Sequence, residues 1–99
     1  MARFDIYQRR DERGYLLDCQ SDLLRDLDTR FTVPLFLFED APKPAGRLNP
    51  VFDVDGQRVV MMAQYASAMR KNLIGNRVGT LEREHDAIMG ALDMLMIGY

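Results

Sequence analysis

The sequence predicts one α+β domain, mainly β, in which several short strands are followed by a single C-terminal helix. Three observations support this fold class. Before Thr80, short apolar runs are separated by turn residues, which is typical of a sheet with tight connections. The dipeptide Asp55-Gly56 stands between two such runs and is a strong indicator of a hairpin. After Thr80 the apolar residues recur every three or four positions, which is the period of a helix.

The length of the chain limits it to one folded unit. Ninety-nine residues can close around one core but not two, so we expect a single domain over residues 1–99. The composition, 47% hydrophobic and 28% charged, excludes collagen-like and disordered chains. One Cys and one His exclude a disulfide framework and an ordinary zinc cluster, and we expect no metal or cofactor. No membrane span or signal peptide is recognisable, which predicts a cytoplasmic protein.

Three apolar segments in the first half predict strands. Residues 3–8 alternate polar and apolar side chains and predict a strand with one buried face. Residues 15–19 predict its hairpin partner, across a charged turn that ends at Gly14. Residues 31–38 are apolar almost throughout, which indicates burial on both faces. Pro34 inside this run cannot donate a ladder hydrogen bond, so we expect an edge, a bulge or a bend there.

Two connections lie beside the third of these strands. Before it, Ser21 is suited to cap a short helical turn that ends near Asp28. After it, residues 39–50 contain three prolines and one glycine, which predicts a loop. The leucines of the helical turn are expected to face inward: Leu23, Leu24 and Leu27.

The second half begins with a predicted hairpin. Residues 51–54 and 57–63 flank Asp55-Gly56, a dipeptide that tolerates the positive φ that a type I′ turn requires at both positions. Residues 67–74 predict a further strand, which ends at the Gly-Asn pair that follows.

A helix is predicted from Thr80 to about Met96. Thr80 is a good N-cap, and acidic side chains follow it, where the positive end of the helix dipole favours them. Gly90 costs about 1 kcal/mol relative to Ala inside a helix, and with its small neighbours it offers a face that another group can approach closely. Five residues spaced by four and three form the stripe expected to face the sheet: Leu81, His85, Ile88, Leu92 and Leu95.

The residues contain no recognisable active site. A cysteine nucleophile needs a base within reach, and Cys19 and His85 are the only thiol and imidazole in the chain. Cys19 lies in an apolar run and is expected to be a small buried hydrophobe, while His85 falls on the core-facing stripe. No phosphate loop, nucleophile elbow or zinc-protease motif is present.

The charge distribution leaves two interpretations open. A net charge of −2 and a pI near 5.3 argue against a non-specific nucleic-acid binder. Residues 41–79 nevertheless carry six basic and two acidic side chains. This segment is either an ordinary mixed surface or a contact area for an acidic partner. Three arginines of the first turn are candidates to join it: Arg9, Arg10 and Arg13.

The C-terminus is the most unusual part of the sequence. The chain ends on Leu95-Met96-Ile97-Gly98-Tyr99 without a polar tail, whereas free ends are usually frayed and polar. An apolar end directly after a helix needs burial, either in its own core or against another chain. A symmetric dimer with this end at its axis would provide that burial. The seven methionines are either core filler or part of an adaptable binding surface.

Taken together, the motifs resemble the CcdB toxin family. The resemblance covers nearly the whole chain, in order and at the right total length. It is carried by Asp18-Cys19-Gln20-Ser21-Asp22-Leu23-Leu24, Val33-Pro34-Leu35, Pro50-Val51, Met61-Met62, Ala66-Ser67, Ile74-Gly75, the helix pattern and Gly98.

The resemblance implies an SH3-like barrel with a small extra antiparallel sheet and a C-terminal helix, assembled as a homodimer. It also implies the toxin of a toxin–antitoxin module. Family members are not enzymes; they bind the A subunit of DNA gyrase and trap the gyrase–DNA cleavage complex. An antitoxin with a disordered, acidic tail releases them, and the antitoxin–toxin complex represses its own operon. DNA is then contacted only through that complex.

The resemblance also implies where gyrase binds. The family's last three residues, a Trp, a Gly and an apolar residue, carry the toxicity. Here Ile97 stands in the Trp position, Gly98 matches, and Tyr99 is the terminal residue. Met96 adjoins them, and Gly90 and Asp93 stand at helix positions that face gyrase. The first-turn arginines Arg9, Arg10 and Arg13 are assigned to the antitoxin on charge alone.

Two other interpretations stay open. A sequence-specific ribonuclease toxin on a similar barrel would need cationic groups to bind RNA and stabilise the transition state, and the basic segment over residues 41–79 could supply them. A degenerate toxin, kept only for operon repression, would bind antitoxin without binding gyrase.

Overall fold

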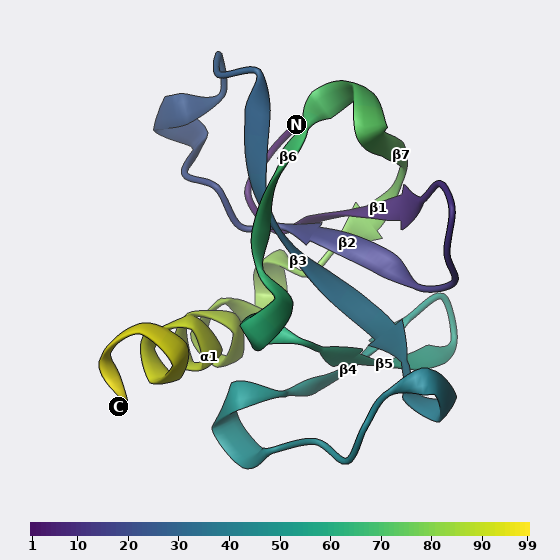
Figure 1. Cartoon of the computed structure of the whole chain (residues 1–99), viewed down its shortest axis with the longest axis vertical. Helices are drawn as coiled ribbons and strands as arrows, with labels where there is room; N and C mark the ends of the chain where they lie inside the picture. Colours follow the sequence, from purple (N-terminus) through teal and green to yellow (C-terminus); the bar gives the residue numbers. More distant parts are fainter.

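The computed structural model describes the whole chain, residues 1–99. One curled antiparallel sheet forms a half-barrel, and a single helix follows it (Figure 1). This arrangement confirms the expected α+β, mainly β class. The elements are β1 (Asp5–Arg9), β2 (Tyr15–Asp18), β3 (Thr29–Leu37), β4 (Val51–Val54), β5 (Gln57–Met61), β6 (Ser67–Arg70), β7 (Ile74–Thr80) and α1 (His85–Ile97).

The strand β3 organises the sheet. The hydrogen-bonded order is β4-β5-β3-β2-β1-β7, and β6 pairs with β3 outside this path. The first part of β3 pairs with β6 and its last part pairs with β5. Pro34 lies between the two parts, and its carbonyl accepts a hydrogen bond from the Met62 amide at 3.0 Å. The expected irregularity at Pro34 is thus the point where β3 changes partners.

The hairpin of β4 and β5 has the predicted turn. Val54 pairs with Gln57, and Asp55 and Gly56 have φ values of 52° and 77°. Both turn positions therefore adopt the left-handed conformation that a type I′ turn requires. The second strand ends at Met61, two residues short of the predicted end, because a 3₁₀ turn begins at Ala63.

The prediction of one strand over residues 67–74 is wrong. β6 ends at Arg70, a 3₁₀ turn follows, and β7 runs from Ile74 to Thr80 beside β1. The Gly75-Asn76 pair does not end a strand. A Cβ on Gly75 would lie 2.5 Å from the Gln8 carbonyl oxygen, so this glycine permits close contact between β7 and β1.

The prediction that the helix begins at Thr80 is wrong, because Thr80 ends β7 and α1 begins at His85 with Glu84 as its N-cap and no side-chain cap hydrogen bond. Thr80 Oγ1 instead accepts a hydrogen bond from the Glu82 amide at 3.1 Å, at the start of the 3₁₀ turn that precedes the helix.

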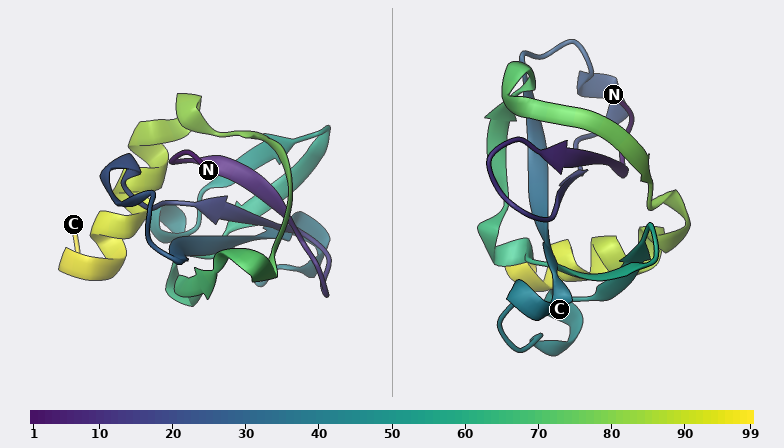
Figure 2. Two further views of the ribbon diagram at one scale, coloured as in Figure 1. Left: turned by 90° about the horizontal axis from the view of Figure 1, so that it is seen from above. Right: turned by 90° about the vertical axis from the view of Figure 1, so that its right-hand side faces the viewer.

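The helix packs on the sheet through its first half only. Ile88 and Leu92 are buried with the sheet's core residues, whereas the His85 and Leu95 side chains are substantially exposed. The prediction that these two side chains face the sheet is therefore wrong. His85 is the first residue of α1, directly after a 3₁₀ turn, and Leu95 belongs to the last turns of the helix, which extend beyond the strands (Figure 2).

The core lies between the half-barrel and α1. Its largest cluster joins buried side chains from β1, β2, β3, β4, β5 and the helix. None of the helices combines the length and the apolar composition that a membrane span requires.

Candidate protein-interaction surface

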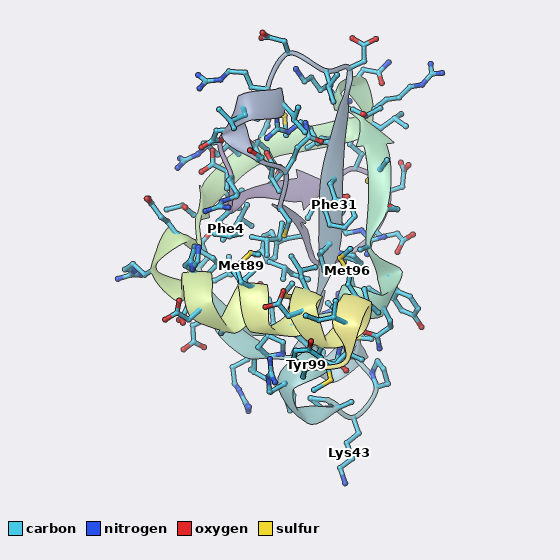
Figure 3. The ribbon with its side chains drawn as sticks, turned by 90° about the vertical axis from the view of Figure 1, so that its left-hand side faces the viewer. Phe4, Phe31, Lys43, Met89, Met96 and Tyr99 are labelled. Carbon is cyan, nitrogen blue, oxygen red and sulfur yellow. The ribbon has the colours of Figure 1, made fainter.

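The apolar C-terminus is not buried in its own core. Met96 is 75% exposed and Tyr99 is 77% exposed, and Ile97 between them is also exposed. Figure 3 shows Met89 and Met96 along the helix, Tyr99 at its end and Phe31 of β3 above it. Because this end has no apolar cover within one chain, it can serve as a contact surface for another protein.

Gly98 fixes the direction in which the chain leaves the helix. It adopts φ 83°, and its amide donates to the carbonyl oxygens of Asp93 and Met94, both at 3.1 Å. This left-handed cap is a common end for a helix and favours glycine. Tyr99 therefore follows a defined turn at Gly98, directly after the end of the helix.

The two helix positions expected to face gyrase have different environments. Asp93 is exposed one turn before the helix end. Gly90 is partly covered by the chain itself, because Arg47 Nη2 donates to the Gly90 carbonyl at 3.2 Å. A Cβ at position 90 would lie 3.6 Å from that nitrogen. The close approach expected at Gly90 is thus made by Arg47 of the same chain.

A second apolar element lies on the same side of the molecule. We call residues 21–28 the leucine turn. Its leucines were expected to face inward, and that prediction is wrong: Leu23 is 93% exposed, and Leu24 and Leu27 are about half exposed. A 3₁₀ segment of three residues, Asp22–Leu24, has no face long enough to bury. The leucine turn and α1 both lie toward the viewer's side in Figure 3.

The sequence contained an indication of this exposure. The leucines are interspersed with Asp22, Arg25, Asp26 and Asp28, and charged side chains at this density cannot be buried together. The Ser21 cap was predicted correctly, since its hydroxyl oxygen accepts a hydrogen bond from the Leu23 amide at 3.2 Å.

The arginines of the first turn lie at the opposite end of the molecule from the C-terminus (Figure 1). Arg9 pairs with Glu12 at 2.9 Å, and Arg13 lies 3.1 Å from Glu39. Arg10 donates to the Ile74 carbonyl at 3.3 Å. The Arg13 pair is exposed on both sides, so it is a weak interaction that an acidic partner can replace.

Cys19 and His85 share no hydrogen bond. Burial, followed by the charge of Asp18, raises the pKa of the Cys19 thiol from 9.0 to about 12, so the thiolate is scarce near neutral pH. His85 Nδ1 lies 3.2 Å from the Asp86 carboxylate, and its ring meets the edge of Phe4. No group of three or more metal-binding side chains comes together.

A buried ion pair lies behind the leucine turn and was not foreseen from the sequence. Arg30 Nη2 lies 2.6 Å from Asp18 Oδ2, and neither side chain is exposed. Burial raises the pKa of the Asp18 carboxyl, and the hydrogen bonds from Arg30 oppose this effect. Asp18 and Arg30 are twelve positions apart in sequence, and the pairing of β2 with β3 brings them together.

Comparison with known proteins gives two findings. The family model of the CcdB protein matches residues 3–98. Among solved structures, the fold is similar to an endoribonuclease in complex with its cognate antitoxin from a mycobacterial species, with a TM-score of 0.79 and 12% sequence identity. That alignment covers 100% of this chain and 98% of the other. No curated protein sequence matches.

Proposed function

The chain belongs to the CcdB family, whose members are toxins of toxin–antitoxin systems, and from this premise we propose that it binds the A subunit of DNA gyrase and traps the gyrase–DNA cleavage complex. The observation that carries the proposal is the exposed apolar end of α1. The contact residues are Met96, Ile97, Gly98 and Tyr99, with Asp93 and Gly90 on the adjoining helix surface.

The leucine turn extends this surface. Leu23 and Leu24 expose apolar side chains on the side of the molecule that also carries α1 (Figure 3). Large exposed apolar side chains on one face of a small domain mark a protein-binding area. A protein surface is therefore a better match for this face than a small substrate.

The active form in this proposal is a homodimer. In a single chain, the last turns of α1 project beyond the sheet (Figure 2), and their apolar side chains lack cover. A symmetric interface would cover part of each helix and bring the two C-terminal ends close together. Gyrase would then meet both ends at once.

The antitoxin is the second partner. We assign an acidic, disordered tail of the antitoxin to Arg9, the last residue of β1, and to Arg10 and Arg13 of the turn between β1 and β2. Exposed pairs such as Arg13 with Glu39 can exchange one carboxylate for another at small cost. The toxin–antitoxin complex would bind operator DNA through the antitoxin, because the toxin itself is acidic.

A matched pair of substitutions tests the gyrase site. Ile97 is 57% exposed and Phe38 is 40% exposed, but Phe38 lies in the 3₁₀ turn after β3, on the side of the molecule away from both α1 and the leucine turn (Figure 1). We expect Ile97→Ser to weaken binding to the purified gyrase A subunit about tenfold or more, while Phe38→Ser leaves it unchanged. Equal losses for both variants would refute the assigned site.

An endoribonuclease is the second candidate function. It is favoured by the similarity in fold to an endoribonuclease. Incubating the purified protein with RNA separates the two candidates, because only a ribonuclease yields cleaved RNA without gyrase present. The gyrase proposal requires the RNA to stay intact.

A further inference from the structure

The leucine turn keeps its shape through hydrogen bonds rather than packing. Leu23 is 93% exposed, and Leu24 and Leu27 are only about half buried, so apolar packing contributes little to holding it. From the outside, the Arg3 amide donates to Asp22 Oδ1 at 2.8 Å and Lys71 Nζ donates to the Arg25 carbonyl at 2.7 Å. Exposed bonds of this kind compete with water and hold a turn weakly.

Gln20 holds the same turn from the inside. Its side chain is buried, and its amide nitrogen Nε2 donates to the Leu24 carbonyl at 2.9 Å. Its amide oxygen Oε1 accepts from the Phe31 amide of β3 at 3.0 Å. One side chain therefore connects the middle of the turn to the first part of the central strand.

Gln20 is itself anchored to the buried ion pair. Its backbone amide donates to Asp18 Oδ1 at 3.0 Å, and Asp18 Oδ2 accepts from Nε and Nη2 of Arg30 at 3.0 and 2.6 Å. Arg30 Nη1 is buried without a hydrogen-bond partner. A buried pair with an unsatisfied donor is a poor source of stability compared with apolar packing, so stability alone is a weak reason for its presence.

We propose that Gln20 is a positioning residue, which holds the leucine turn in one conformation with its leucines exposed to the toxin's protein target. The inference rests on the proposed function, because the target is gyrase as assigned above. Asp18 and Arg30 fix Gln20, and Gln20 fixes Leu24. The target then meets an ordered apolar turn and loses less conformational entropy on binding.

A double-mutant cycle separates positioning from a general loss of stability. Gln20→Met keeps the volume of the side chain and removes both amide hydrogen bonds. We expect it to weaken binding to the gyrase A subunit about tenfold in the natural sequence, and by less than about twofold when Leu23→Ser has already removed the turn's contact. Gln64→Met, the same substitution at an exposed glutamine in the 3₁₀ turn after β5, should leave the affinity unchanged. An equal loss from Gln20→Met in both backgrounds would show that Gln20 only stabilises the fold.

A second readout does not depend on gyrase. In the full-length protein, backbone amide order parameters of residues 22–28 should fall from about 0.85 toward about 0.6 in Gln20→Met, while those of β4 and β5 stay constant. Unchanged order in the turn would overturn the inference. If the natural sequence does not bind gyrase at all, the proposed function fails, and the order parameters still decide what Gln20 does. Should Gln20→Met not fold, Gln20→Asn, which is one methylene too short to span both partners, gives the same comparison.

Discussion

At the scale of single residues, Ile97 is where the proposed gyrase site departs from the family pattern. Isoleucine can bury apolar area, but it cannot make the cation–π contact that a Trp at this position could make with an arginine of the target. We expect Ile97→Trp to tighten binding about 2- to 30-fold, the equivalent of about 0.5–2 kcal/mol. Titration of the purified A subunit measures this change. A weaker complex would mean that position 97 meets a site of different shape.

Because of Cys19, the free energy of unfolding decreases as the pH rises through the alkaline range. Folding raises the pKa of its thiol from 9.0 to about 12, so the unfolded chain loses this proton first. The stabilising contribution is therefore complete below about pH 9 and declines by about 1.4 kcal/mol per pH unit above it. Tyr7, whose pKa is raised to about 12 by burial and then by Asp5, adds a decline above about pH 10.

The variant Cys19→Ala isolates the contribution of the thiol. Urea unfolding at about pH 8 and about pH 10.5 should show a smaller loss of stability for the variant than for the natural sequence. The readout is the change in unfolding free energy between the two pH values. The packing lost with the sulfur lowers the stability of the variant equally at both, so it cancels from this change. Parallel pH dependences would show that the thiol ionises as easily in the folded chain as in the unfolded one.

At the scale of elements, Gly75 allows β7 to pair with β1. A Cβ there would lie 2.5 Å from the Gln8 carbonyl oxygen, whereas a Cβ on Gly79 of the same strand would meet nothing closer than 4.0 Å. We expect Gly75→Ala to lower the free energy of unfolding by about 1–3 kcal/mol, and Gly79→Ala to leave it unchanged or slightly higher. Thermal unfolding of the two variants provides the comparison. Equal melting temperatures would contradict the close contact between the strands.

The elements that could be predicted from the sequence are those whose cause is local. The Asp55-Gly56 turn and the Ser21 cap depend on neighbouring residues, and both are present. The role of Gly75 depends on its contact with β1, about 65 positions away in the sequence. Local sequence patterns do not reveal that contact, so Gly75 was interpreted as the end of a strand. The outward leucines have a similar explanation, because their position follows from tertiary hydrogen bonds such as that of Gln20 with Leu24.

The candidate site was predictable to a similar degree. An apolar ending after a helix is visible in the sequence, and the structure leaves it exposed. The cover over Gly90 was not predictable, because Arg47 reaches it from the loop before β4. The arginines Arg9, Arg10 and Arg13 were grouped by sequence alone, and each has a partner within the chain.

At the scale of the whole molecule, the exposed end of α1 predicts a dimer. Leu95 in the last turns of the helix is 42% exposed and Leu73 at the far end is 54% exposed. Sedimentation should give about twice the chain mass of 11.4 kDa for the natural sequence and for Leu73→Glu, and the single-chain mass for Leu95→Glu. A single-chain mass for the natural sequence at all concentrations would refute the proposed homodimer.

The most direct test mixes purified gyrase, ATP, supercoiled plasmid and a reporter RNA with the protein, and then denatures the reaction. A toxin that traps the cleavage complex leaves linear DNA bound covalently to the gyrase A subunit, and the RNA remains whole. A chain lacking residues 97–99 should leave the plasmid circular. Circular plasmid together with fragmented RNA would contradict gyrase poisoning and identify the protein as a ribonuclease.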